Sequence, residues 1–177
     1  VASISGDLDA YVLRVDTAGG QQWWQSWGGV HDDEWRGVVN NGNQFVMAGH
    51  TDSYGPVVAG HPLRSIYMLA MNTAGDTLWT RTVSDPALAS EAESITLASN
   101  GDLMVAGEIG NDHLTDALVM RTGTTGVTVW RRTYDLANED VLHALAVLPD
   151  GGFIAAGRSF GQNGAQAALI RKNGTGF

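Results

Sequence analysis

The densest group of metal-ligand side chains is an acidic segment that begins at His31 and reads His-Asp-Asp-Glu. Carboxylate oxygens close together in a loop are ligands that calcium prefers. The candidate metal ligands are Asp32, Asp33 and Glu34, with calcium as the candidate ion. The alternative is a structural role, in which these carboxylates accept hydrogen bonds from backbone amides. Related acidic segments, also expected in loops, recur at 90–93 and 138–140, and this recurrence favours the structural role.

Side chains that could act in catalysis are scattered along the chain. The histidines show no H-x-x-x-H spacing and no pairing with a carboxylate on one expected strand. No serine occupies a G-x-S-x-G motif. The chain contains no cysteine, which excludes disulfides, thiolate metal sites and a cysteine nucleophile. We therefore predict that the protein is not an enzyme.

Aromatic side chains beside Asp and Asn residues form a second candidate site. Such side chains bind sugars by stacking on the ring, but they also pack between sheets. The candidate binding residues are Trp23, Trp27, Trp35, Tyr54 and His61. The last two belong to the segment 52–64, which is longer than its counterparts elsewhere in the chain.

The elements that must position these residues repeat along the chain. One pattern of about 50 residues, a period typical of propellers and other repeat arrays, occurs three times, and a fourth copy begins near Gln166. Each copy runs from an apolar strand through a glycine turn, a tryptophan strand and an acidic segment to a strand with an Ala-Gly pair. The landmarks are Trp24, Trp79 and Trp130, and Gly49, Gly107 and Gly157.

Each copy contains four short strand patterns separated by turn residues, which predicts a four-stranded antiparallel sheet. The strands are apolar-rich on both faces, so we expect the sheets to stack around an axis. The predicted fold class is an all-β β-propeller of four-stranded antiparallel blades, partial or completed by an oligomer. The expected units are a partial blade at 1–28, blades at 35–84 and 92–134, and a partial blade at 142–177. The segment 136–148 also fits a helix, but repeat register favours a strand.

Composition limits the class of partner. The formal charge of −9 and the lack of a Lys/Arg-rich stripe argue against nucleic acid. No apolar run approaches the roughly 20 residues that a membrane-spanning helix needs. The first residues lack the basic and apolar regions of a signal peptide, and they begin within a strand pattern. We therefore expect that the first residue is not the biological start. The incomplete first and last blades predict either a portion of a longer protein or a ring that a second chain completes.

The first copy carries a specific motif. Its residues are Asp9-Ala10, Asp16, Gly20 and Trp24, then Gly28-Gly29 and Asp33, then Ala48-Gly49. With this motif the chain resembles, over essentially its whole length, the SBBP-type β-propeller repeats of bacterial secreted and surface proteins. Later copies depart from the motif, for example at Asn72 and Gly123 in place of Asp16. The resemblance implies a propeller and an extracellular, cell-surface or periplasmic location, and it supplies no catalytic residues.

A weaker similarity links the segment 121–130 to quinoprotein propeller repeats, which also place a glycine turn before a tryptophan. The expected function is a non-enzymatic propeller module that mediates protein–protein contacts or structural assembly. Its expected partners are other protein subunits or further blades of the same protein. The alternative is a lectin-like propeller that binds glycans, and a third hypothesis is an enzyme built on further blades. No cofactor other than calcium is expected.

Overall fold

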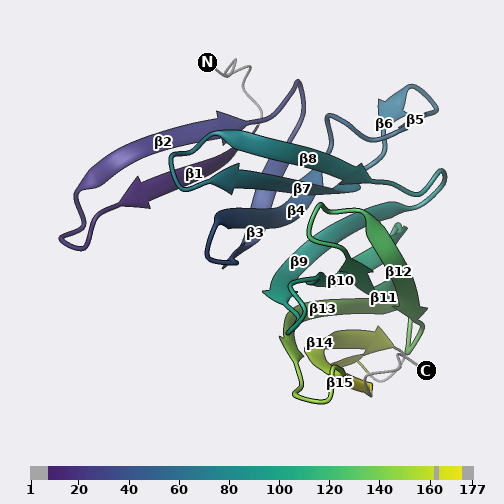
Figure 1. The fold of residues 1–177 in the computed structure, drawn as a ribbon. Coiled ribbons are helices and arrows are strands. Elements are labelled where there is room, and N and C mark those ends of the chain that lie inside the picture. Colours follow the sequence, from purple (N-terminus) through teal and green to yellow (C-terminus); the bar gives the residue numbers. More distant parts are fainter. Residues whose placement is uncertain (1–7, 162–163, 173–177) are drawn as a thin grey trace.

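The computed structural model describes residues 8–161 and 164–172 (Figure 1). These residues form fifteen β-strands and no helix, so this part of the chain has no helical element able to cross a membrane. The strands are β1 (Ala10–Val15), β2 (Gln21–Trp27), β3 (Asp33–Asn40), β4 (Gln44–Thr51), β5 (Val57–Val58), β6 (His61–Pro62), β7 (Ser65–Asn72), β8 (Thr77–Val83), β9 (Ala89–Leu97), β10 (Leu103–Asn111), β11 (Leu114–Thr122), β12 (Thr128–Tyr134), β13 (Glu139–Val147), β14 (Phe153–Gly161) and β15 (Gly164–Lys172). Repeat register therefore predicted β13 correctly over the helical alternative.

Consecutive strands pair antiparallel into sheets. The first sheet has the order β3-β4-β7-β8, and β9, β10, β11 and β12 pair in sequence to form the second. A third sheet contains β13, β14 and β15 and meets the second through one parallel pair, Thr115 with Glu139. Strands β1 and β2 form a hairpin, and β5 and β6 form a short arm between β4 and β7. The predicted all-β class with antiparallel sheets is thus confirmed.

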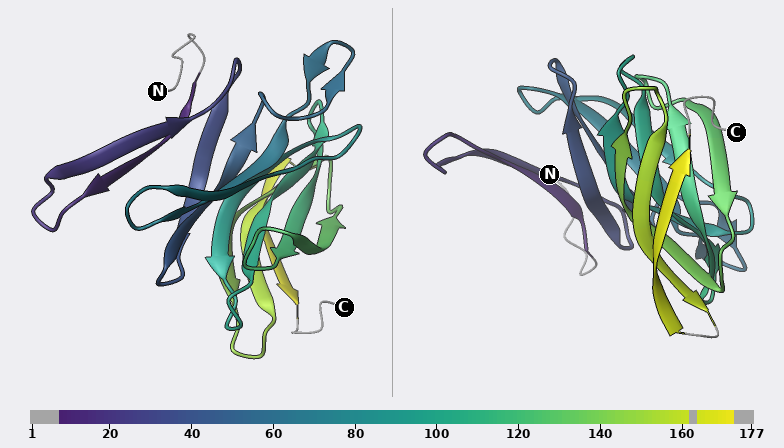
Figure 2. Two further views of the ribbon diagram at one scale, coloured as in Figure 1. Left: turned by 45° about the horizontal axis from the view of Figure 1, so that its top comes forward. Right: turned by 90° about the horizontal axis from the view of Figure 1, so that it is seen from below.

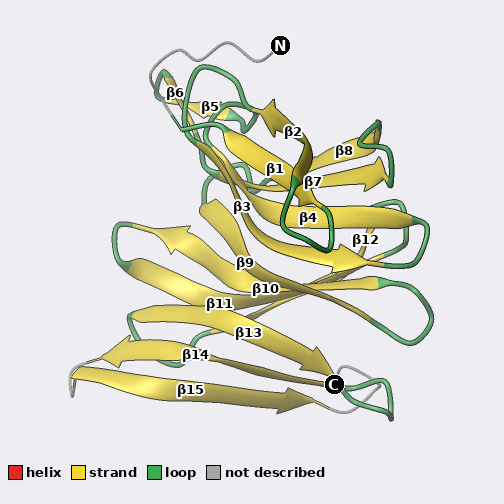
Figure 3. Ribbon diagram, turned by 90° about the vertical axis from the view of Figure 1, so that its left-hand side faces the viewer, coloured by secondary structure: helices red, strands yellow, loops and turns green. Residues whose placement is uncertain are grey.

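The sheets follow one another in chain order (Figure 3). Strand β9 of the second sheet contacts β3, β4 and β7, and β13 contacts β9, β10 and β11. The β1–β2 hairpin contacts β3, packs on the first sheet and lies at one end of the described structure (Figure 2). In the part of the chain that the structure describes, the sheets do not close into a barrel or ring.

Each of the three large sheets has a bulge opposite a glycine. The bulged residues are Arg36, Glu93 and His143, on β3, β9 and β13. A Cβ added to Gly49 would lie 1.8 Å from the Glu34 carbonyl oxygen, and one added to Gly157 would lie 1.8 Å from that of Val141. Only glycine allows the strands to approach so closely. This contact explains why an Ala-Gly pair recurs in every copy.

Apolar clusters fill the space between neighbouring sheets. One cluster joins the first and second sheets, and another joins the second and third. A third cluster, centred on Met47, Leu69 and Met71, packs against Trp23 and Trp27 of the hairpin. Met68 and Leu69 are both fully buried, although successive strand residues point to opposite faces. The first sheet is therefore covered on both faces, as the apolar-rich strands predict.

The structure corrects the alignment of the tryptophans. Cα pairing makes Trp23, not Trp24, the equivalent of Trp79 and Trp130. A shift of one residue in a strand moves a side chain to the other face. Accordingly Trp23 packs against the core, whereas Trp24 is 58% exposed.

The acidic segments are also placed differently from the prediction. Asp33 and Glu34 belong to β3, residues 90–93 belong to β9, and Glu139 and Asp140 open β13. The loops are shorter in the structure than predicted, because backbone pairing with the following strand continues through these acidic residues. Asp33, for example, pairs with Thr51.

Candidate functional site

The predicted aromatic residues lie at the seam between the hairpin and the first sheet, apart from His61. Trp35 stacks on Tyr67 with ring centroids 4.9 Å apart, and Tyr54 lies against the same ring at 5.5 Å. Burial raises the pKa of Tyr67 to about 12. The Tyr54 hydroxyl donates to the carbonyl oxygen of Gly28. These contacts bring the aromatic rings together as packing elements.

Trp23 and Trp27 pack on the third apolar cluster, and the buried Nε1 of Trp23 donates to no acceptor in the described residues. His61 stands apart on β6 of the arm. The five predicted binding residues therefore do not gather on one exposed platform. Their assignment to sugar binding stays a prediction.

The three predicted metal ligands point to different partners. The Asp32 carboxylate accepts a hydrogen bond from the Leu8 amide at 2.9 Å. The buried Asp33 accepts from the Gly29 amide at 2.9 Å and from the Ser53 hydroxyl at 2.8 Å. Glu34 forms an ion pair with Arg36 at 3.2 Å. Within residues 8–161 and 164–172, no three His, Asp or Glu side chains are grouped to hold a metal, and calcium binding stays a prediction.

Asp140 shows the role of a buried carboxylate at the start of the first strand of a sheet. It occupies the place of Asp33 in the third sheet, and its Oδ2 accepts from the amides of Leu136 and Ala137 at 2.6 and 2.9 Å. In both sheets the carboxylate fixes the loop that leads into the strand. The hydrogen bonds thus agree with the structural role that recurrence favoured.

One hollow does bring two of the predicted residues together. It measures about 440 Å³ and lies between the β5–β6 arm and the end of β4. Its lining is His31, Asp32, Asp52, His61, Pro62 and Arg64. Arg64 forms an ion pair with Asp52 in this hollow, so the charges of these two lining residues already neutralise each other.

Arg64 is the centre of an ion-pair network between the first and second sheets. Its guanidinium binds the Asp52 carboxylate through two hydrogen bonds of 2.9 and 2.8 Å and binds Glu91 Oε2 at 2.9 Å. His50 Nδ1 lies 3.5 Å from the same Glu91 oxygen. Burial and, next, the charge of Arg64 lower the pKa of His50. Burial would raise the pKa of Asp52, but the hydrogen bond and charge of Arg64 outweigh it and the pKa is lowered.

Glu108 breaks a pattern that the other two sheets keep. The residue after the recurring glycine is His50 on β4, Glu108 on β10 and Arg158 on β14. His50 and Arg158 each lie beside a glutamate, whereas Glu108 pairs directly across from Glu91. Burial, and then the hydrogen bond and negative charge of Glu91, raise the pKa of Glu108 to about 7.

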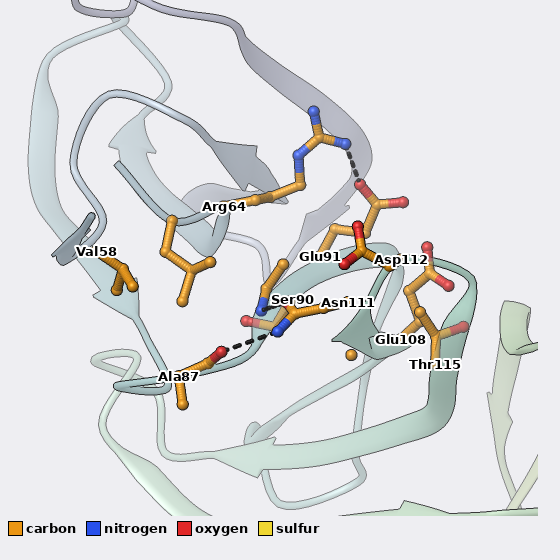
Figure 4. Close-up of a pocket in the computed structure, with 12 residues that line it drawn as sticks. Val58, Arg64, Ala87, Ser90, Glu91, Glu108, Asn111, Asp112 and Thr115 are labelled. Carbon is orange, nitrogen blue, oxygen red and sulfur yellow. Dashed lines mark hydrogen bonds and ion pairs between the residues drawn. The ribbon is translucent and has the colours of Figure 1, made fainter. Parts of the chain in front are cut away.

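Glu91 and Glu108 both line an open pocket of about 430 Å³ (Figure 4). The arm and the loop after it provide Val58, Leu63 and Arg64. The loop before β9 and the start of β9 provide Ala87, Ala89, Ser90 and Glu91, and β10, the turn after it and β11 provide Glu108, Gly110, Asn111, Asp112 and Thr115. The pocket therefore combines carboxylates with a short apolar wall.

The raised pKa of Glu108 predicts a dependence of stability on pH. Because the folded state holds this proton more tightly, the contribution is present below pH about 4.5 and is lost as pH rises through about 7. Partial exposure screens the interaction, so we expect a contribution of about 1 kcal/mol. Urea unfolding at pH 5 and pH 8 should show that Glu108→Gln stabilises the protein relative to wild type only at pH 8.

The comparison with Glu108→Gln separates the effect of Glu108 from the effects of other titrating groups. A stability difference between the two proteins that is equal at pH 5 and pH 8 would contradict the assignment.

Sequence reasoning singled out none of Arg64, Glu91 and Glu108 as site residues. Arg64 lies at the end of the long insertion, and its partners are distant in sequence. One signal was available, because the residue that follows the recurring glycine is basic or a histidine in two copies and acidic in the third.

Comparison of the sequence with protein-family models gave no match, and comparison with curated proteins gave none either. The assignment of function therefore rests on the repeated sheets and on the surfaces that they leave open.

Proposed function

We propose that this chain is a non-enzymatic segment of a β-propeller that mediates protein–protein contacts or structural assembly. Its partners are further sheets of the same repeat, from other subunits or from the same protein. The exposure of the two terminal sheets carries this proposal.

The third sheet exposes a face that is buried in the other two. Leu169 on β15 pairs with Ala156 just as Met68 on β7 pairs with Ala48 and Val119 on β11 pairs with Ala106. Met68 and Val119 are fully buried against the next sheet, whereas Leu169 is 69% exposed. The equivalent apolar residue is buried in the first and second sheets and exposed in the third. This exposed face of the third sheet is therefore a surface on which another sheet could pack.

The hairpin exposes the face that, in the first sheet, packs against the unit preceding it in the chain. Leu13 on β1 occupies the position of Leu69 on β7, which is fully buried against the preceding hairpin. Leu13 itself is 47% exposed, and Tyr11 and Val15 on the same face are exposed too. The two ends thus present complementary faces, one suited to a preceding sheet and one to a following sheet. Such a pair permits head-to-tail association.

Two further features support a radial arrangement. The bulged residues of β3, β9 and β13 meet, with Arg36 Nε 3.7 Å and His143 Nδ1 3.4 Å from the Glu93 carboxylate. Adjacent units are also joined by one recurring backbone contact, from the Asp33 amide to Leu8 and from the Ser90 amide to Arg64. Equivalent residues that converge on one line are expected where sheets share an axis. The location that we propose, outside the cytoplasm, rests on the resemblance of the repeat alone.

Sedimentation velocity over a range of concentrations tests the proposal. We expect the chain to associate with itself, because a second copy offers the matching faces. Leu169→Asp should weaken this association by at least about tenfold, since it places a charge in a contact that must exclude water.

Val129→Asp is the matched control. Val129 on β12 is 59% exposed, and Leu78 at the same position of β8 is exposed as well, so this face stays open inside the repeat. A wild-type chain that is monomeric at every concentration, or equal effects of the two substitutions, would contradict the proposal.

A further inference from the structure

A groove of about 440 Å³ lies between the hairpin and the first sheet. It is lined by residues 11–13 of β1, residues 35–38 of β3 and Met47 of β4. Three consecutive residues of β1 line it, although successive strand residues point to opposite faces, so the groove follows one edge of β1. The other edge of β1 pairs with β2, and no strand of the described residues pairs with the groove edge. The backbone groups of this edge are therefore free to pair with another strand.

The large sheets show which strand belongs at this edge. Pairing with the tryptophan strands makes β1 the counterpart of β7 and β11. On its other edge β7 pairs with β4, and β11 pairs with β10. We call β4, β10 and β14 the Ala-Gly strands, because each contains three apolar residues followed by alanine and glycine, at 45–49, 103–107 and 153–157. A strand of this kind is the one that the position of β1 calls for.

One side chain of the groove is exposed where its counterpart is covered. Val38 on β3 holds the position of Ile95 on β9, because each pairs with the residue two before the recurring glycine. Val38 is 61% exposed, whereas Ile95 is 7% exposed and belongs to an apolar cluster with Val46 and Ala48 of β4. The Ala-Gly strand of the preceding sheet thus helps to cover Ile95. A strand of the same kind in the groove would cover Val38.

Charge complementarity favours the same occupant. Arg14 on β1 holds the position of Arg121 on β11, since each pairs with the packed tryptophan of the neighbouring strand. The Arg121 guanidinium binds the carboxylate of Asp102, the residue before β10, through Nη2 at 2.6 Å and Nε at 2.7 Å. Arg14 donates to the Thr73 carbonyl oxygen, but it has no carboxylate partner in the part of the chain that the structure describes. A strand preceded by an acidic residue would supply one.

We propose that the groove binds an Ala-Gly strand from another unit of the same repeat, which pairs antiparallel with β1. This inference rests on the proposed function for the kind of partner and adds a specific site for it. The alanine of the strand lies opposite Val12, as Ala106 lies opposite Val119 on β11. The side chains of this alanine and of the residue two before it face Val38. An acidic residue just before the strand binds Arg14.

Titration of the full chain with a labelled peptide of residues 101–110, followed by fluorescence anisotropy, tests the site. The peptide is acidic and the chain has a formal charge of −9, so non-specific charge attraction does not favour binding. We expect saturable binding with a dissociation constant of about 0.1–1 mM. Amide hydrogen exchange within residues 11–13 should slow at saturation, because strand pairing protects backbone amides.

Val38→Asp should weaken binding of the peptide by at least about tenfold, because it places a charge against the apolar side chains of the added strand. Val129→Asp is the matched control, since Val129 is 59% exposed on β12 and lies outside the groove. It should leave binding unchanged. Circular dichroism of each variant verifies that a loss of binding is not a loss of folding.

A second pair of substitutions tests the register. Asp102→Asn in the peptide should weaken binding by about two- to threefold, as suits an exposed ion pair. Arg14→Gln in the chain should remove this difference, so that both peptides bind equally. A difference between the peptides that persists with Arg14→Gln would overturn the register.

A peptide of the same composition in scrambled order is the control for sequence. The inference is overturned if binding does not saturate by about 5 mM, or if the scrambled peptide binds equally well. It is also overturned if Val38→Asp and Val129→Asp act alike, or if hydrogen exchange within residues 11–13 is unchanged at saturation.

Leu169→Asp separates this inference from the proposed assembly. It alters a face of the third sheet and leaves every residue of the groove in place, so it should bind the peptide as wild type does. Peptide binding by a chain that never self-associates would contradict the assembly alone. Self-association without peptide binding would contradict the groove alone.

Discussion

Gly49→Ala is expected to destabilise the protein by about 3 kcal/mol or more, the upper part of the range for overpacked interiors. The added methyl group would lie 1.8 Å from the carbonyl oxygen of Glu34 and 2.9 Å from the Cα of Trp35. Both atoms belong to the backbone of β3, so no side chain can move aside to make room. The strands would have to separate at a point where they pair directly, Trp35 with Gly49. Urea unfolding measured by tryptophan fluorescence should show a lower midpoint.

Gly123→Ala is the matched control for this substitution. Gly123 also sits next to a strand, but an added Cβ would come no closer than 4.0 Å to the Val127 carbonyl oxygen. We expect a change in the free energy of unfolding within about 0.5 kcal/mol. Equal changes in the free energy of unfolding for Gly49→Ala and Gly123→Ala would show that β3 and β4 do not approach each other this closely.

Asp140→Ala is expected to cost about 2–4 kcal/mol. The carboxylate is fully buried and accepts hydrogen bonds from the Leu136 and Ala137 amides. Removal leaves two amides without an acceptor at the entry to β13, and hydrogen bonds to a charged group contribute about 1.5–3 kcal/mol each. Thermal unfolding followed by circular dichroism measures the loss.

Asp140→Asn keeps one acceptor oxygen at nearly the same shape and should recover at least half of the lost stability. Asp150→Ala is the exposed counterpart, because Asp150 also accepts from a backbone amide, that of Gly152, but lies at a turn in solvent. It should cost less than about 1 kcal/mol. Equal losses for Asp140→Ala and Asp150→Ala would show that the buried loop is not held by this carboxylate.

Most strands were predictable because the signals for them are local. Short apolar-rich segments end at glycine turns, and side chains such as Asp16 and Asn72 bond the amides that follow them. Repeat register also decided between helix and strand at 139–147, where local pattern was ambiguous. Strand boundaries were predicted less well. The acidic ends of β3, β9 and β13 were expected in loops because charged residues lack a strand pattern.

The candidate site was mostly beyond sequence reasoning. Aromatic residues were chosen as binding residues by type, yet burial depends on which face of a strand each side chain occupies. Trp23 and Trp24 are adjacent and have opposite environments. Likewise, the carboxylate of Glu108 meets that of Glu91 only because β9 and β10 pair in one register.

The sequence by itself determined a repeat, its strands, its turns and the need for a glycine in each copy, since these follow from backbone geometry within neighbouring residues. Only the tertiary structure decided which faces are covered, which ion pairs join the sheets and where a charge is unmatched. Such properties depend on contacts between residues far apart in the chain, such as Arg64 with Glu91. Burial and charge pairing arise from the packing of whole sheets, and no single copy of the repeat contains that information.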